Sequence, residues 1–172
     1  MTTAVTLPAA EVARRIRIDH EILLRRIDGR SPEELAVEFT LESGPLGDFC
    51  ESLHDLLAHV LMWDEIGLAV LTEHRAGRHH WSIDPRWETA DAGRRLNRAG
   101  VLAGRELPAS LLVHRLVSVR DALLAEIQRY PEPTWQGAEA VGELAQRAMT
   151  VPGNPPFLHA ALHLDEVGWL TP

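Results

Sequence analysis

The sequence predicts an all-α protein, a four-helix bundle formed by a single domain that spans residues 1–172. Apolar residues recur with the helical period of 3.6 in five segments, and no run alternates strictly enough to predict a β-strand. Prolines and glycines separate these segments. A chain of 172 residues buries roughly 70% of its unfolded surface in one core, so four long amphipathic helices with irregular links are the simplest architecture.

The first half of the chain is expected to hold two long helices and a short one. The first long helix is expected over residues 8–28, where four apolar residues fall on one stripe. A short helix is expected to begin at Ser31, a capping residue followed by a proline and two acids. The second long helix is expected over residues 52–77, where Ser52 and Asp55 resemble a capping box with Asp in place of Glu.

The second half is expected to hold the other two long helices. A polar link that contains tryptophans is expected over residues 78–87, and a short helix over residues 90–103. The third long helix is expected over residues 108–130, where a Pro-Glu-Pro sequence ends it. A weak helix over residues 139–149 precedes a proline-rich turn, and the last helix is expected over residues 156–170.

Composition narrows the classes of protein. Cys50 has no second cysteine to pair with, which favours a reducing compartment. The first ten residues lack the features of a signal peptide, and no apolar stretch approaches the ~20 residues that span a bilayer. A soluble, cytoplasmic protein with no membrane partner is therefore expected. The net charge is −8 and no basic block exceeds a pair, which predicts no nucleic-acid partner.

Three histidines form the candidate metal site. His159 and His163 lie four residues apart, so on one helix their rings share a face, a common way to hold zinc or a similar ion. Such pairs also often face solvent. His59 lies on the apolar stripe of the second long helix, where a buried ring needs partners for both nitrogens. A metal ion with a hydrogen bond would supply them, and so would a backbone carbonyl or a carboxylate.

Two sequence stretches resemble the DinB/YfiT-like superfamily. SLHDLLAHVLMWDE, residues 52–65, is similar to its second helix, in which a histidine ends a leucine-rich half-helix. FLHAALH, residues 157–163, is similar to its last helix, with two histidines four apart. The resemblance covers nearly the whole chain. It implies an up-down-down-up bundle in which His59, His159 and His163 are the metal ligands.

Two branches of that superfamily are similar to this chain. One is the N-terminal domain of mycothiol-dependent maleylpyruvate isomerase and related thiol S-transferases, in which a metal holds a thiol cofactor as thiolate. The other is the ClbS/DfsB-like branch, to which residues 87–111 are similar. Some of its members open an electrophilic ring and so protect against reactive small molecules. The chain ends soon after the last expected helix, without the second domain of the isomerase, which argues against isomerase activity but not against thiol transfer.

A three-histidine site predicts chemistry on an electrophilic small molecule. Three neutral ligands leave a divalent ion its full charge and an open position, where water or a thiol becomes nucleophilic. Zinc is the first expectation, with nickel, iron or manganese as alternatives, and a low-molecular-weight thiol as a possible second cofactor. Glu65 and Glu166 are the candidate catalytic carboxylates, with Asp64 beside them, although solvated helix acids are the simpler interpretation of each.

The remaining candidates are weaker. His20 is a minor competitor as a ligand, His114 is expected at the rim of the bundle, and Cys50 is expected to pack because no base accompanies it. Trp81, Trp87 and Trp135 lie in links; they could line a pocket mouth but are expected to anchor those links. The alternatives to an enzyme are a protein that sequesters a ligand without turnover and a structural protein. A homodimer remains open.

Overall fold

The computed structural model describes residues 6–39, 49–87, 89–137, 141–151 and 153–168. Within these ranges the chain is all-α, with no β-strand and a single bridge between Glu38 and Ser52. The predicted fold class is therefore confirmed. None of the helices in these ranges combines the length and apolar character needed to cross a bilayer.

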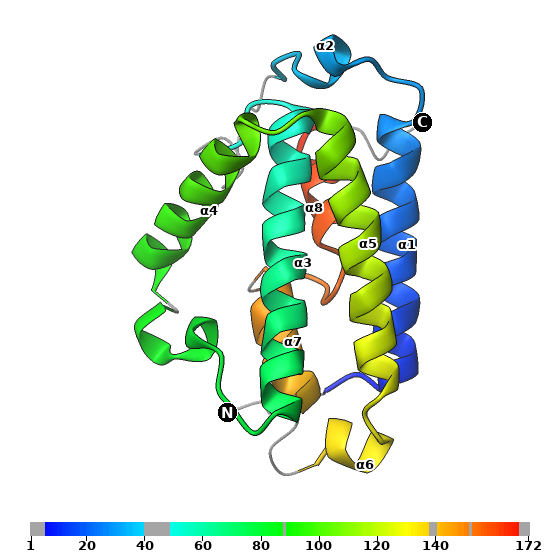
Figure 1. Cartoon of the computed structure of the whole chain (residues 1–172), viewed down its shortest axis with the longest axis vertical. Coiled ribbons are helices and arrows are strands. Elements are labelled where there is room, and N and C mark those ends of the chain that lie inside the picture. The colour runs from blue at the N-terminus through cyan, green and yellow to red at the C-terminus, as the bar shows by residue number, and fades with distance from the viewer. Residues whose placement is uncertain (1–5, 40–48, 88, 138–140, 152, 169–172) are drawn as a thin grey trace.

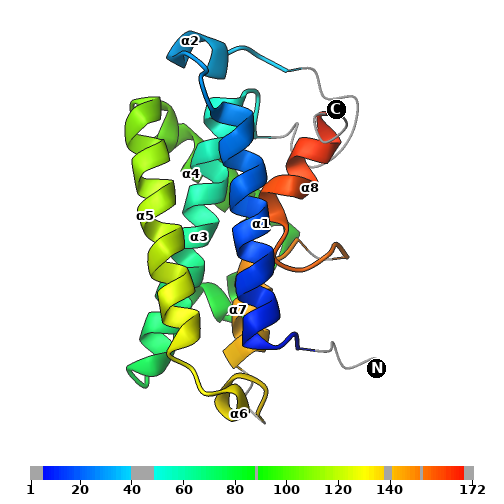
Figure 2. The ribbon, with the colours of Figure 1, turned by 90° about the vertical axis from the view of Figure 1, so that its right-hand side faces the viewer.

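Three long helices run side by side through the molecule: α1 (Ala9–Ile27), α3 (Leu53–Arg75) and α5 (Ala109–Gln128) (Figure 1). The remaining side holds two shorter helices, α7 (Val141–Met149) along the lower half and α8 (His159–Glu166) along the upper half (Figure 2). The expectation of a long last helix over residues 156–170 is thus wrong in length, although its central eight residues are helical.

Backbone conformation explains the short last helix. Phe157 adopts a positive φ of 61°, which a side chain disfavours and which a helix excludes, so α8 cannot begin before it. Gly168, with φ of 68°, follows the other end of α8, where a glycine takes the left-handed conformation without a steric penalty. Trp169 and the residues after it, which completed the expected helix, lie outside the described residues.

The short elements follow local chemistry. Ser31 forms the expected cap of α2 (Pro32–Leu35), with a complete capping box. Ser52 caps α3, because its hydroxyl accepts from the backbone N–H of Asp55. The Asp55 side chain is shorter than the Glu of a complete capping box, and it accepts from the backbone N–H of Glu51 and not from that of Ser52. The predicted link after α3 contains two 3₁₀ turns, η2 (Trp81–Ile83) and η3 (Pro85–Trp87). After α5 the prolines begin a further turn, α6 (Glu132–Trp135).

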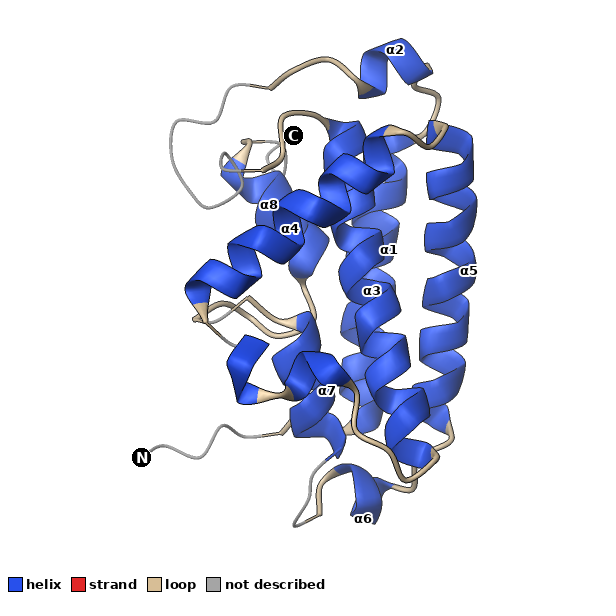
Figure 3. Ribbon diagram, turned by 60° about the vertical axis from the view of Figure 1, so that its left-hand side comes forward, coloured by secondary structure: helices blue, strands red, loops and turns tan. Residues whose placement is uncertain are grey.

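Helix α4 (Ala90–Arg105) leans away from the bundle (Figure 3), and the N-terminal half of the helix forms part of a cavity wall. Its C-terminal end is close to α3, because a Cβ added to Gly104 would lie 2.2 Å from the Cβ of Ala58. Its N-terminal half diverges from α3 in the figure. Gly93 and Asn97, on that half, line a cavity that is described below.

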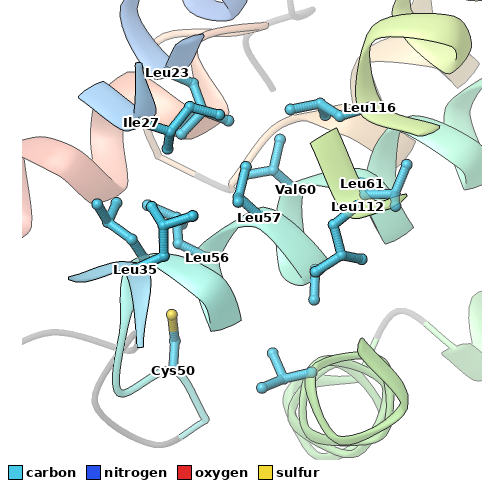
Figure 4. Close-up of a cluster of buried hydrophobic side chains, with 14 of the residues drawn as sticks. Leu23, Ile27, Leu35, Cys50, Leu56, Leu57, Val60, Leu61, Leu112 and Leu116 are labelled. Carbon is cyan, nitrogen blue, oxygen red and sulfur yellow. The ribbon is translucent and has the colours of Figure 1, made fainter. Parts of the chain in front are cut away.

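The core consists of two apolar clusters. The upper one joins α1, α3 and α5 through leucines such as Leu23, Leu57 and Leu116, which point toward one another in Figure 4. Cys50 packs in the same cluster, where burial raises the pKa of its thiol. The lower cluster gathers around Trp135, whose ring is fully buried and whose Nε1 donates to Leu7 O. Trp135 therefore anchors its link, as expected.

Candidate metal centre

The three histidines predicted as ligands come together in the upper half of the bundle. His59 lies mid-way along α3 and is 2% exposed, whereas His159 begins α8 and His163 follows one turn later. The Nε2 atom of His59 is 2.9 Å from that of His159 and 3.2 Å from that of His163. A hundred residues separate the two segments, so tertiary packing alone creates this cluster, while metal ligation by these residues stays a prediction.

The cluster favours neutral rings. Burial lowers the pKa of His59 well below its usual 6.5, and the neighbouring His163 lowers it further. Burial also lowers the pKa of His159 well below that value, with smaller contributions from His59, His163 and the guanidinium of Arg120. A neutral imidazole keeps one lone pair, and a lone pair is what a metal ligand requires.

The outer nitrogens of the rings differ in their partners. His163 Nδ1 lies 2.9 Å from the carboxylate of Glu166, a pairing that orients the ring with Nε2 toward the cluster. His59 Nδ1 is buried and has no hydrogen-bond partner among the described residues, and the ring of Phe49 lies beside it, at 4.8 Å between ring centroids. An unpartnered buried nitrogen costs free energy, so packing stability alone does not account for a histidine at this position.

The donor set fits a divalent metal ion. Candidate ligand nitrogens of all three rings lie within 4.8 Å of one another. A four-coordinate ion with bonds of ~2.0–2.1 Å separates its ligands by about 3.3 Å, so small ring rotations bring the three nitrogens onto one ion. Three imidazoles suit zinc, nickel and iron alike. The described residues supply three ligands to this cluster, which leaves a position for a water or a substrate.

The cluster lies in the wall of a cavity of about 650 Å³, a size typical of small-molecule sites. The indole Nε1 of Trp63 donates to Asn97 Oδ1 at 2.8 Å and so links α3 and α4 beside it. Trp87 from η3 also lines this space, so the alternative role for that tryptophan, lining a pocket mouth, is the observed one. The lining residues are Phe49, His59, Trp63, Ser82, Ile83, Trp87, Thr89, Ala90, Gly93, Asn97, Gln146, Arg147, Ala148, Met149, Thr150, Val151, Gly153, Asn154, His159 and His163.

The two candidate catalytic carboxylates occupy different places. Glu166 contacts His163 directly, as described above. Glu65 instead forms an ion pair with Arg115 of α5 and does not line the cavity. Asp64 lies in the core, bonded to the guanidinium of Arg120 at 2.6 Å. The catalytic role of either glutamate remains a prediction, and only Glu166 touches the histidine cluster.

Sequence reasoning missed a buried polar network beside the cluster. Arg120 of α5 is 1% exposed and joins Asp64 of α3 to Asp19 of α1. Asp19 in turn accepts from the backbone of α8 at Ala160 and Ala161. A signal was available: Arg120 lies four residues after Leu116 on the apolar stripe of its helix, where a charged residue requires buried partners.

The other histidines do not join the cluster. His20 is half-buried on α1, its Nε2 has no hydrogen-bond partner among the residues that the structure describes, and burial lowers its pKa to about 4. His114 is exposed, as expected for the rim. His54 is half-buried, and its Nε2 lies 3.0 Å from Leu107 O. His80 is buried against Ser82 at the start of η2.

Comparison with known proteins finds similarity of structure but not of sequence. No family model matches the chain, and no curated protein matches it. An uncharacterised protein from Escherichia coli UTI89 superposes with a TM-score of 0.72 at 14% identity, covering 94% of this chain and 92% of that one. The colibactin self-resistance protein ClbS, solved in complex with double-stranded DNA, gives 0.67 at 18% identity, covering 97% and 95%.

The second of these structures corrects one expectation. A protein with the same fold was solved with double-stranded DNA, so the exclusion of nucleic acid from the net charge of −8 is wrong. Net charge sums over the entire surface, whereas binding depends on where the basic groups gather. Together the comparisons and the helical architecture show that this chain has a ClbS-like all-α fold.

Proposed function

We propose that this protein is a metal-dependent enzyme that adds a thiol or water to an electrophilic small molecule, in detoxification or self-resistance. The observation that supports the proposal best is the convergence of three imidazole nitrogens in the wall of a cavity of about 650 Å³. The fold shared with a colibactin self-resistance protein supports the choice of biological role.

His59, His159 and His163 would hold the ion, with zinc tested first. Such an ion supplies Lewis acidity, which makes a water or a thiol nucleophilic near neutral pH. Glu166 keeps the His163 ring in orientation through its 2.9 Å contact and can accept a proton through that ring. Glu65 remains the second candidate catalytic carboxylate. To act on a substrate it would have to leave its ion pair with Arg115, since it does not line the cavity.

The cavity walls supply substrate binding. Trp63 and Phe49 give flat apolar surface, and Asn97 and Gln146 give amide groups for hydrogen bonds. The lining residues within the described chain include no aspartate or glutamate, so no carboxylate on the wall can pair with a cation. These walls favour an uncharged or anionic substrate that is partly aromatic or unsaturated.

Metal content is the first test. Protein purified without an affinity tag is analysed for zinc, nickel, iron and manganese, and the metal-free form is titrated with each. We expect one ion per chain, and a His163→Ala variant that retains none. A wild-type protein that takes up none of the four metals contradicts the enzymatic proposal.

Turnover is the second test, with styrene oxide as a model electrophile. In the thiol reaction an S–C bond forms, the ring C–O bond breaks, and the oxygen takes the thiol proton; in the water reaction the product is the diol. Mass spectrometry with and without mycothiol separates the two. Binding without either product, in metal-loaded protein, would favour the alternative of a sequestering protein, which the cavity alone also supports. A double-stranded DNA duplex belongs among the ligands tested, given the ClbS complex.

A further inference from the structure

Helix α8 carries two of the three candidate ligands, but its own sequence does not determine where the helix begins. It has eight residues, and its capping residue Leu158 makes no side-chain hydrogen bond. Helices this short are unstable alone. The buried residue before the cap, Phe157, has the disfavoured φ of 61°, a conformation that persists only where surrounding contacts enforce it. Contacts from elsewhere must therefore fix where α8 begins.

Asp19 of α1 supplies those contacts. Its Oδ1 accepts from the backbone N–H of Ala161 at 2.8 Å, and its Oδ2 accepts from that of Ala160 at 3.2 Å. These are two of the N–H groups that a helix leaves unpaired at its start. A carboxylate at this point also matches the positive end of the helix dipole. Asp19 thus acts as the N-terminal cap of α8, although it lies some 140 residues earlier in the chain.

Arg120 holds Asp19 in place. Its Nη2 donates to Asp19 Oδ2 at 2.8 Å, and its Nε donates to Asp64 Oδ2 at 2.6 Å. The Arg120 and Asp19 side chains are each 2% exposed. A guanidinium is planar and rigid, so one fork fixes both carboxylates. A continuous set of bonds therefore runs from α3, which carries His59, through α5 and α1 to the first turn of α8, which carries His159.

We propose that Asp19 and Arg120 are positioning residues of the metal centre, which fix α8 so that His159 and His163 meet His59. The inference rests on the proposed metal site. Ligand atoms must be held within about 0.5 Å for a tight site, and groups that orient ligands typically change metal affinity 10–100-fold when removed. Neither residue lines the cavity, so neither contacts the substrate there.

The test uses Co²⁺, whose visible absorption reports coordination geometry, with the full-length metal-free protein. In Asp19→Asn one oxygen becomes an NH₂ group, which faces a donor in either orientation: Ala161 N–H in one, Ala160 N–H and Arg120 in the other. The matched control is Glu126→Gln. Glu126 is also a buried carboxylate bonded to arginines, Arg75 and Arg129, but it lies near the C-terminal end of α5 and pairs with the last residue of α3, sixteen residues after His59.

We expect Asp19→Asn to weaken Co²⁺ binding at least 10-fold and to change the visible spectrum, measured well below the thermal midpoint of each variant. Glu126→Gln should stay within twofold of wild type with an unchanged spectrum, even if it is less stable. Arg120→Lys keeps the charge but loses the fork, and serves the same test if Asp19→Asn does not fold.

Two results overturn the inference alone: wild-type affinity and spectrum in the folded Asp19→Asn or Arg120→Lys protein, or an equal loss in Glu126→Gln. A wild-type protein that binds neither Co²⁺ nor Zn²⁺ overturns the metal centre itself, and this inference with it.

Discussion

Two polar clusters are buried next to each other in this bundle, and they are built on opposite principles. In the arginine cluster, Arg120 donates from all three of its nitrogens, to Asp64, to Asp19 and to the carbonyl of Ile16. In the histidine cluster, the Nε2 of His59 faces two other Nε2 atoms, and its Nδ1 has no hydrogen-bond partner in the part of the chain that the structure describes. The arginine cluster is closed, because its charged groups bond to one another, whereas the histidine cluster is open, because its ring nitrogens face one another.

The difference separates a structural role from a binding role. Charged groups without partners are costly to bury, so the arginine cluster persists because its bonds are complete. Three ring nitrogens that point at one another cannot all form hydrogen bonds, since each pair shares a single proton at most. A metal ion placed between them would give each nitrogen a bonding partner. The arginine cluster therefore connects helices, whereas the histidine cluster, which lines a cavity, is available to a ligand.

The largest expected effect follows from opening the closed cluster. Replacing Arg120 with methionine leaves Asp19 and Asp64 buried without their cation, so the free energy of unfolding should fall by about 3–5 kcal/mol. Chemical denaturation measures it. Arg115→Met on the same helix removes a half-exposed ion pair with Glu65 and should cost no more than about 1 kcal/mol. Equal losses in the two variants would remove the distinction between the clusters.

His59→Ala tests the open cluster. Metal and activity should be lost together, because only a weak two-histidine chelate remains. The fold should persist, because the apolar clusters of the core are unchanged. A structural site of four ligands contributes about 10–16 kcal/mol, so one ligand corresponds to about 3–4 kcal/mol of metal affinity. Calorimetric titration and circular dichroism measure the two properties. If the histidines only pack, the variant loses about 1–3 kcal/mol of stability and nothing else.

A smaller effect is expected at the carboxylate beside the open cluster. Glu166→Gln keeps an acceptor for His163 Nδ1 but loses the charge, so metal affinity should fall about 10-fold. Glu65→Gln is the matched variant, and it should leave metal affinity within twofold because Glu65 bonds to Arg115 instead. Metal titrations and turnover of both variants decide which glutamate serves the site. A larger loss in Glu65→Gln would reverse the assignment.

The smallest effect concerns pH and His20, a neighbour of the closed cluster. Its folded pKa is lowered to about 4 by burial and then by Arg120, against 6.5 when unfolded. A lowered histidine pKa means that the unfolded state takes up the proton first, so stability present above pH 6.5 is lost as pH falls toward 4. Relative to His20→Gln, the free energy of unfolding of wild type should fall by about 0.5–1 kcal/mol per pH unit between pH 6 and 5. The effect is this small because the ring is only half-buried and solvent screens it. Urea denaturation at several pH values checks this, and parallel pH profiles would contradict it.

Helix positions were predictable where the local signal was strong. The stripes and caps place α1, α3 and α5 within two residues of their expected bounds, because periodicity and proline act within one turn of chain. The last helix was misjudged at Phe157, where tertiary contacts enforce a backbone conformation that the apolar sequence does not encode. The division of the fourth bundle position between α7 and α8 was missed for the same reason.

The candidate site divides in the same way. The sequence by itself determined an all-α chain, the buried position of His59 on its stripe, and a histidine pair on one face of the last helix, since each depends on neighbours within four residues. Only the tertiary structure decided that the pair meets His59, that Glu65 pairs with Arg115 and not with the cluster, and that Asp19 begins α8. These contacts join residues 50 to 142 positions apart in the chain, and no local pattern fixes how such segments pack.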